Sequence, residues 1–182
     1  MTDPMILFLA RLHPRKRVLS FIEMASILRD RGVSAQYRVV GPDGGDLVKA
    51  RQLVRKRKLE DQVVFVGRLP SEAVPQEYLR SAVYVLPSVD EPFPMTVLEA
   101  LALGTPCVVT DSCFVAPLLM KSGAALISSP GPEDLADAVG RILNDVELAE
   151  KLSAAGRHLI NEKLTVERVA DSLEMYYEGA HA

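Results

Sequence analysis

Two glutamates bracket the start of a short helix that the sequence predicts in the middle of the chain. Glu91 lies in the loop before this helix and Glu99 lies within it, eight positions later. Pro94 suits the first turn of a helix, where a missing N–H does no harm, and Gly104 ends the helix. A helix N-terminus attracts anions through its free N–H groups and its dipole. Because 25% of the residues are charged, such a pair also arises by chance, and its meaning depends on its surroundings.

Two basic residues, Arg11 and Lys16, occupy the turn after the first apolar run at residues 5–10. Cations in such a turn either contact phosphate groups at a binding site or are simply solvated. A second basic run follows at Arg51 and residues 55–58. We interpret this run as the solvated face of a helix whose cations suit its C-terminus; the alternative is a phosphate-binding patch.

Short apolar runs alternate with stretches of helical periodicity along the whole chain. The runs predict strands at residues 5–10, 35–40, 63–66, 83–86, 107–110 and 124–127. Apolar positions three and four apart predict helices at residues 17–31, 46–58, 95–103, 115–121, 133–143, 147–161 and 166–178. One more helix follows Ser71, its expected cap; Pro75 fits only if the helix proper begins there, and Tyr78, Leu79 and Ala82 should face inward. These repeats predict an α/β fold, a doubly wound, six-stranded, mostly parallel Rossmann-like sheet with helices on both faces.

Length and composition are those of an ordinary globular protein. The 182 residues favour a single domain spanning residues 1–182, and 48% of them are apolar. A net charge of −3 gives no reason to expect a nucleic-acid partner. No apolar run approaches the roughly 18 residues of a membrane span, and the N-terminus does not resemble a signal peptide, so we expect a cytoplasmic protein.

Neither the cysteines nor the histidines predict a metal site. Cys107 and Cys113 are too few for a zinc site or a disulfide framework. We expect both to be small buried hydrophobic residues, with a reactive thiol as the alternative at Cys113. The three histidines, His13, His158 and His181, lack metal-ligand spacing. We therefore expect no metal ion and no cofactor.

In a parallel sheet, the loops that follow the strands gather along one edge. That edge would hold cations, flexible backbone, a helix N-terminus and carboxylates, contributed by Arg11, Lys16, Asp111 and residues 41–45, 67–69 and 91–96. Cations and N–H groups suit phosphates, and carboxylates suit ribose or sugar hydroxyls, so the set suits a nucleoside diphosphate. The usual dinucleotide fingerprint and the Walker lysine motif are absent from the sequence.

The ordered set of loop motifs resembles a known family. The motifs are Arg11-Leu-His-Pro-Arg-Lys16, Gly41-Pro-Asp-Gly44, Gly67-Arg-Leu69, Pro87-Ser-Val-Asp-Glu91 and Glu99-Ala-Leu-Ala-Leu-Gly104. Together they are similar to the C-terminal, donor-binding domain of family 4 retaining glycosyltransferases, which have the two-domain GT-B fold. The similarity covers nearly the whole chain.

The resemblance implies three catalytic candidates and a ribose contact. Arg11 and Lys16 match the arginine and lysine that contact the donor's pyrophosphate, where fixed cations stabilise the departing nucleoside diphosphate. Glu91 is expected near the transferred sugar and the positive charge that develops at its anomeric carbon, and Glu99 at the nucleotide ribose. The alternatives are a solvated turn for the two cations, a helix-terminus role for Glu91 and an exposed helix carboxylate for Glu99.

The remaining candidates are substrate-binding positions. The backbone N–H groups of Met95 and Thr96 are expected to meet the donor's phosphate or sugar. Phe93 and Pro94 precede them in the stretch Pro92-Phe93-Pro94, where the family usually has Gly-Phe-Gly or a similar small-residue form. Proline permits less close approach than glycine and supplies no N–H, so we expect an altered sugar pocket. Another pair, Arg68 and Leu69, is expected beside the base.

Such enzymes carry a second α/β domain ahead of this one, which binds the acceptor and supplies catalytic groups. The resemblance implies the donor-binding half of a metal-independent glycosyltransferase that uses a UDP or GDP sugar, with the N-terminal acceptor domain absent from this chain. Alone, this half should bind nucleotide weakly and transfer little or no sugar. The helix at residues 166–178 should leave an apolar face uncovered, and membrane contact is expected only through the missing domain. The rival hypotheses are a non-catalytic nucleotide-sugar-binding regulatory subunit and a fragment of a GT-B-fold sugar-nucleotide epimerase.

Overall fold

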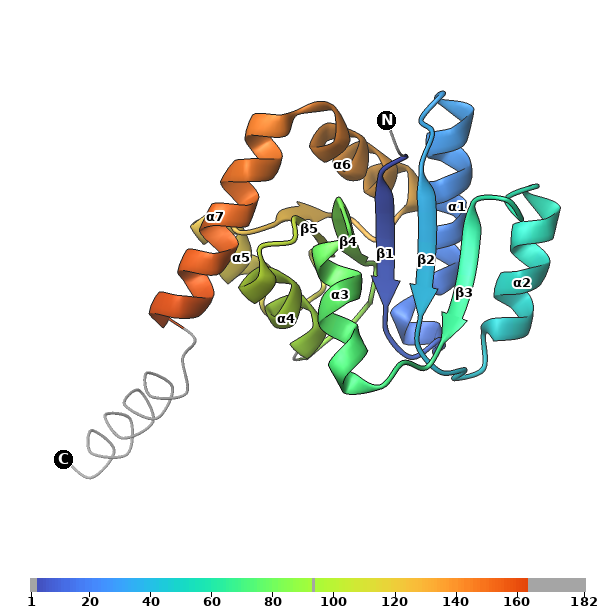
Figure 1. The fold of residues 1–182 in the computed structure, drawn as a ribbon, viewed down its shortest axis with the longest axis horizontal. Coiled ribbons are helices and arrows are strands. Elements are labelled where there is room, and N and C mark those ends of the chain that lie inside the picture. Colours follow the sequence, from blue (N-terminus) through green and yellow to red (C-terminus); the bar gives the residue numbers. More distant parts are fainter. Residues whose placement is uncertain (1–2, 93, 164–182) are drawn as a thin grey trace.

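Six parallel strands form one sheet at the centre of the protein (Figure 1). The computed structural model describes residues 3–92 and 94–163. The strands are β1 (Met5–Leu9), β2 (Gln36–Val40), β3 (Val63–Gly67), β4 (Val83–Leu86), β5 (Cys107–Thr110) and β6 (Leu126–Ser128). Their order is β3-β2-β1-β4-β5-β6, and each neighbouring pair is parallel. The chain builds outward from β1 to β3 and then returns to build the other half from β4, so the predicted doubly wound sheet is confirmed.

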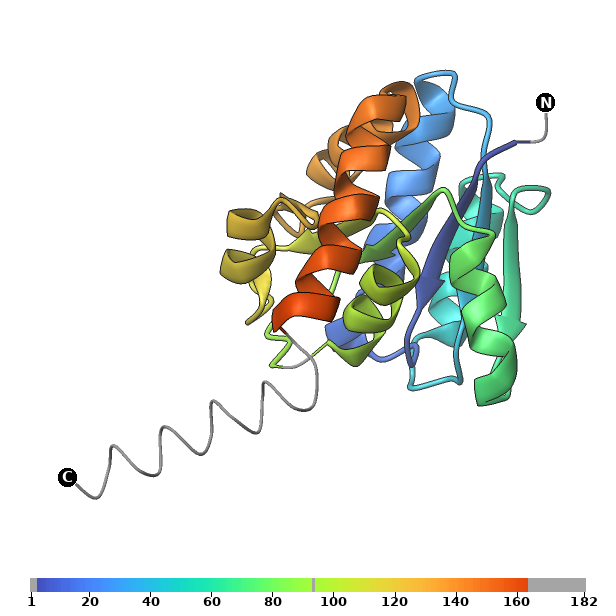
Figure 2. The ribbon, with the colours of Figure 1, turned by 60° about the vertical axis from the view of Figure 1, so that its left-hand side comes forward.

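Helices cover both faces of this sheet (Figures 1 and 2). On one face, α1 (Val18–Asp30) packs against α2 (Leu47–Lys56) and α6 (Pro132–Asn144). On the other, α3 (Val74–Leu79) packs against α4 (Met95–Leu103), and α7 (Val146–Lys163) lies against α4. The short α5 (Ala116–Ser122) contacts β6 and α7. The 3-10 turns η1 (Pro14–Lys16) and η2 (Ser71–Ala73) lead into α1 and α3.

The hydrophobic core lies around the central strands of the sheet and makes them rigid. Every residue of β4 and β5 is buried, as are the three central residues of β1. Between β1 and α1, Phe8 packs against Phe21 at a centroid distance of 5.6 Å, and Phe21 meets Tyr37 edge-on at 6.0 Å. Full burial of such a side chain stabilises the fold by about 1.5–3 kcal/mol. At the sheet edge, by contrast, Val64 of β3 remains 45% exposed.

The predicted elements within the described residues are present, and two local predictions are wrong. Ser71 does not cap a helix; it begins η2, and its hydroxyl donates to Glu72. Pro75 occupies the first turn of α3, as its missing N–H requires. Tyr78 is 1% exposed, whereas Leu79 is 57% exposed because the next residue of a helix points about 100° away. The helix predicted at residues 166–178 lies outside the described residues.

The basic run of α2 and its C-terminal turn is exposed, as predicted for a solvated helix face. Arg57 pairs with Glu23 of α1 at 2.8 Å, and the Arg51 guanidinium lies 5.0 Å from the ring centre of Phe65. Among the described helices, none combines the length and the apolar character that crossing a bilayer requires.

Candidate functional site

The loop after β2 packs tightly against the loop after β1 and supports Arg11. The Leu12 N–H donates to the Pro42 carbonyl at 2.9 Å, and the Leu12 carbonyl accepts from Asp46 N–H at 3.0 Å. Gly41 has φ +140°, and a Cβ there would lie 2.0 Å from the Ala10 carbonyl oxygen. These glycine-rich residues are therefore needed for close approach of two backbones.

Arg11 itself is exposed and lies against the same glycine-rich loop. A Cβ at Gly44 would come within 2.8 Å of Arg11 Cγ, so the aliphatic part of the side chain rests where a larger residue would stand. The stem of Arg11 is thus held while its guanidinium stays accessible at the sheet edge. A solvated cation and a phosphate ligand both fit this exposure.

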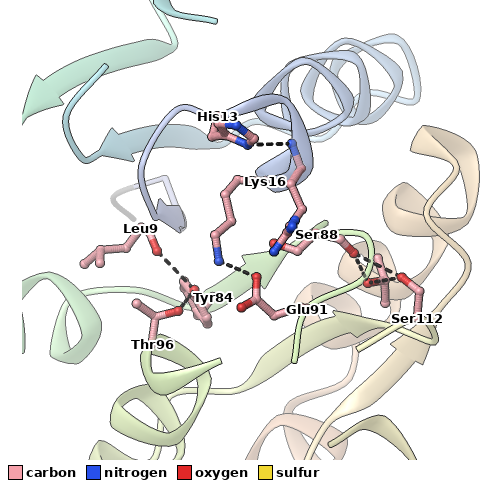
Figure 3. Close-up of polar contacts among 10 residues, drawn as sticks. Leu9, His13, Lys16, Tyr84, Ser88, Glu91, Thr96 and Ser112 are labelled. Carbon is pink, nitrogen blue, oxygen red and sulfur yellow. Dashed lines mark hydrogen bonds and ion pairs between the residues drawn. The ribbon is translucent and has the colours of Figure 1, made fainter. Parts of the chain in front are cut away.

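Lys16 is positioned by a short, well-braced turn. His13 Nδ1 accepts from Arg15 N–H at 3.2 Å at the start of η1, and Arg17, at φ 54°, reverses the chain into α1. The Lys16 ammonium then donates to Oε2 of Glu91 (Figure 3). Sequence reasoning assigned these two residues to phosphate and sugar separately, and the structure brings them together as an ion pair.

Glu91 is buried and its loop is held from two neighbouring loops. Its carbonyl accepts from Phe114 N–H at 2.9 Å, and Val89 N–H donates to the Arg15 carbonyl at 2.9 Å. The side chain of Glu91 is 8% exposed and that of Lys16 is 24% exposed. The N-cap residue of α4, Pro94, makes no side-chain capping bond, and the side-chain hydrogen bond that the structure gives Glu91 is the one from Lys16. A buried carboxylate paired with a partly buried ammonium is strongly coupled to its partner.

Two buried tyrosines lie behind the polar face of α4. The Tyr78 hydroxyl donates to Oε2 of Glu99 at 3.0 Å. The Tyr84 hydroxyl donates to Thr96 Oγ1 at 2.8 Å and to the Leu9 carbonyl at 3.2 Å, sharing one proton between two acceptors (Figure 3). Burial raises the pKa of both Tyr78 and Tyr84 well above the ordinary value, so both phenols remain protonated donors at neutral pH.

Glu99 and Thr96 line an open pocket of about 530 Å³ beside the end of β1. Its other walls are mostly apolar and come from Leu9, Ser71, Val74, Pro75, Tyr78, Ala102 and Leu103. Glu99 is exposed, as the alternative interpretation allowed, yet one of its oxygens is fixed by a buried donor. Sequence reasoning missed the pocket walls on η2 and α3, although their position after β3 places them at the same edge.

The other predicted substrate-binding positions are more dispersed. Arg68 is exposed and Leu69 half-buried after β3, and neither lines the pocket at Glu99. Met95 is 55% exposed in the first turn of α4. Helix geometry leaves the first N–H groups of α4, those of Met95 and Thr96, without an intrahelical acceptor.

The loop before α4 carries the predicted departure from the family pattern. Pro94 is buried immediately before α4, and its carbonyl accepts from Val97 N–H at 2.9 Å. Phe93 lies outside the described residues. The effect of this loop on a sugar pocket stays a prediction.

Both cysteines are buried, as predicted. Burial raises the pKa of the Cys107 thiol, and it likewise raises that of Cys113, which lies beside Glu91 and Lys16. Both therefore remain thiols, which argues against a reactive Cys113. Within residues 3–92 and 94–163, no three histidine, cysteine or acidic side chains gather as a metal-ligand set.

Comparison with known proteins gives the family context. Alpha-D-kanosaminyltransferase from Streptomyces kanamyceticus is 29% identical over 175 residues, covering 96% of this chain and 45% of that protein. Sucrose-phosphate synthase from Thermosynechococcus elongatus superposes with a TM-score of 0.84 at 27% identity, covering 98% of this chain and 46% of that one. Anabaena HepE, solved in complex with UDP-glucose, shares the fold with a TM-score of 0.83 at 20% identity, covering 96% and 49%.

This chain thus spans less than half the length of each of these three proteins. Residues 1–159 match the family model described as glycosyl transferases group 1. The resemblance inferred from the loop motifs is confirmed: the chain belongs to the glycosyl transferases group 1 family.

Proposed function

We propose that this chain is the donor-binding half of a retaining, metal-independent glycosyltransferase that takes a sugar from a UDP or GDP sugar. The observation that carries the proposal is the meeting of Lys16, Glu91 and the start of α4 at one edge of the sheet, in a member of this family. We include retention of the sugar's configuration in the proposal because the set of loop motifs resembles that of retaining enzymes. The HepE complex supports a nucleotide sugar, since that protein holds UDP-glucose on the same fold.

The phosphate side of the proposed site combines two cations with a helix N-terminus. Arg11 and Lys16 follow β1, and α4 begins after β4, the strand beside β1. As the bond between sugar and diphosphate breaks, negative charge grows on the leaving group, and fixed positive charge lowers that barrier. These groups provide the charge that a divalent metal supplies in other enzymes.

The sugar side is assigned to Glu91. In the free chain its carboxylate is paired with Lys16 and buried, so both charges are preorganised before a ligand arrives. A diphosphate on Lys16 would share that ammonium with Glu91, leaving a carboxylate next to the anomeric carbon. A negative group there favours the positive charge that develops on the sugar ring.

The nucleoside side is assigned to the pocket beneath Glu99. The apolar walls from Leu9, Val74 and Pro75 suit the face of a base, and Glu99 supplies an acceptor for hydroxyl groups. A charged hydrogen bond of this kind is stronger than a neutral one. The matched relatives are about twice as long, and we assign acceptor binding to a second domain.

The named relatives favour a transferase over the rival hypotheses. Two relatives above 25% identity are named as a kanosaminyltransferase and a sucrose-phosphate synthase, names that fit sugar transfer. A regulatory subunit would keep the same nucleotide site but would not regain transfer when the acceptor domain is supplied. An epimerase would change its nucleotide sugar without any acceptor.

Calorimetric titration tests the nucleotide site directly. UDP, GDP and ADP are titrated into wild type, Lys16→Ala and the control Lys151→Ala, which removes an exposed lysine of α7 paired with Glu147. We expect wild type and Lys151→Ala to bind UDP or GDP equally, and Lys16→Ala to bind at least about tenfold more weakly, because a charged hydrogen bond is lost. Equal dissociation constants for wild type and Lys16→Ala would refute the role of Lys16.

A further inference from the structure

Tyr78 is the buried partner of an exposed carboxylate. It is 1% exposed on α3, yet it is one of the residues that line the pocket, and its hydroxyl donates to Oε2 of Glu99 at 3.0 Å. A glutamate on a helix surface has several torsions free, and one fixed donor removes much of that freedom. The contact joins α3 to α4 across 21 residues of sequence.

The tyrosine is itself held rigidly, so it can impose an orientation. Its carbonyl accepts from Thr105 Oγ1 at 2.9 Å. Its ring meets Tyr84 nearly edge-on, with centroids 5.4 Å apart and an interplanar angle of 81°. Tyr84 is tied in turn to Thr96, one helical turn before Glu99. The two polar side chains of α4 that line the pocket, Thr96 and Glu99, are thus both held by buried tyrosines.

The direction of the bond decides what Glu99 can still do. The phenol occupies Oε2 and leaves Oε1 to accept from a ligand. Because a carboxylate only accepts, the ligand group facing it must be a donor, such as a hydroxyl. The basic groups at the other end of the site are not needed for this contact.

We propose that Tyr78 is a positioning residue that turns the Glu99 carboxylate so that Oε1 accepts from a ribose hydroxyl of the bound nucleotide. The inference rests on the proposed function, because it needs a nucleotide in the site. It goes further in assigning recognition of the ribose hydroxyl to a residue pair, in which Tyr78 acts through Glu99 and Glu99 contacts the ligand.

Tyr78→Phe removes one hydroxyl and keeps the ring. Tyr37→Phe is the matched control, since Tyr37 is also fully buried but its hydroxyl has no hydrogen-bond partner within the described structure. Each protein is titrated with UDP and with 2′,3′-dideoxy-UDP, and the GDP pair is measured in parallel. The readout is the ratio of the two dissociation constants, which reports the ribose contact and is insensitive to a uniform loss of binding.

We expect wild type and Tyr37→Phe to bind the dideoxy nucleotide about tenfold more weakly than the natural one, because a charged hydrogen bond is lost. In Tyr78→Phe the ratio should fall to about threefold or less, through weaker binding of the natural nucleotide. Glu99→Gln should lower the ratio as well, and adding Tyr78→Phe to it should change the ratio little further.

An unchanged ratio in Tyr78→Phe would overturn this inference and leave the proposed function standing. Failure of wild type to bind any of the nucleotides would overturn both. If Tyr78→Phe does not fold, a crystal structure of wild type soaked with UDP decides the matter. A ribose hydroxyl on Oε1 with the Tyr78 bond retained supports the inference, and a broken Tyr78 bond or a ribose elsewhere overturns it.

Discussion

The two ends of the site are built by different means. At the end formed by Lys16 and Glu91, two opposite charges sit on loops, and backbone hydrogen bonds between neighbouring loops hold them. At the end formed by Thr96 and Glu99, the polar groups that line the pocket are on a helix, and buried tyrosines hold them. Damage to the first end should therefore act through backbone strain and unpaired charge, and damage to the second through lost orientation.

The largest expected effect comes from the loop that supports the charged end. Gly41→Ala would place a Cβ 2.0 Å from the Ala10 carbonyl oxygen, at a φ of +140° that alanine rarely adopts. We expect the free energy of unfolding to fall by about 2–4 kcal/mol, since clash and strain add. Urea denaturation monitored by circular dichroism measures the change.

Gly45→Ala is the matched control for that substitution. Gly45 also has positive φ, +114°, but no atom lies within 4 Å of a Cβ built there. It should lose only about 1–2 kcal/mol, the part that comes from backbone conformation. Equal losses of unfolding free energy in the two variants would show that the close approach of the two loops does not contribute to stability. Backbone contacts between loops would then not be what holds the charged end of the site.

The next effect comes from separating the ion pair. Lys16→Met keeps most of the length of the side chain but leaves the Glu91 carboxylate, 8% exposed, without its cation. We expect a loss of about 1–3 kcal/mol in the free energy of unfolding, below the value for a fully buried pair because Lys16 is 24% exposed.

The double variant Lys16→Met/Glu91→Gln separates charge from packing. The neutral amide removes the uncompensated charge, so the double variant should regain about 1 kcal/mol or more over Lys16→Met. Urea denaturation of wild type, both single variants and the double variant completes the cycle. Strictly additive losses would mean that the two charges do not interact in the folded protein.

The sheet and the charged loops could be predicted from the sequence, because both depend on patterns among residues that are close together in the chain. Apolar runs at β4 and β5 mark strands buried on both faces, and the glycine-rich residues after β2 mark a tight loop. Contacts between distant residues leave no such signal. The bond between Lys16 and Glu91 spans 75 positions, and that between Tyr78 and Glu99 spans 21.

Tyr78 shows the limit most clearly. Its helical spacing predicts an inward-facing side chain, and it is buried as predicted. Helical periodicity predicts that the ring is buried but does not predict the partner of the hydroxyl. That partner depends on how α3 packs against α4. The prediction that Leu79 faces inward is wrong for a related reason, because a six-residue helix is too short for an apolar pattern to define its buried face.

The smallest expected effect concerns the end supported by the tyrosines, and it appears only at alkaline pH. Burial raises the pKa of Tyr78 above its ordinary value near 10, so the folded state keeps a proton that the unfolded state loses as the pH rises past 10. The stabilising contribution of the buried phenol is full below pH 10 and declines above it, by at most about 1.4 kcal/mol per pH unit for one tyrosine.

Urea denaturation between pH 9 and 11 should therefore show a shallower decline of the free energy of unfolding with pH in Tyr78→Phe than in wild type. Gly45→Ala should leave the slope in this range close to that of wild type, because neither glycine nor alanine has a side chain that titrates. A slope unchanged by Tyr78→Phe would mean that the phenol is not shielded as the contact with Glu99 requires, and the two ends would then differ less than their construction indicates.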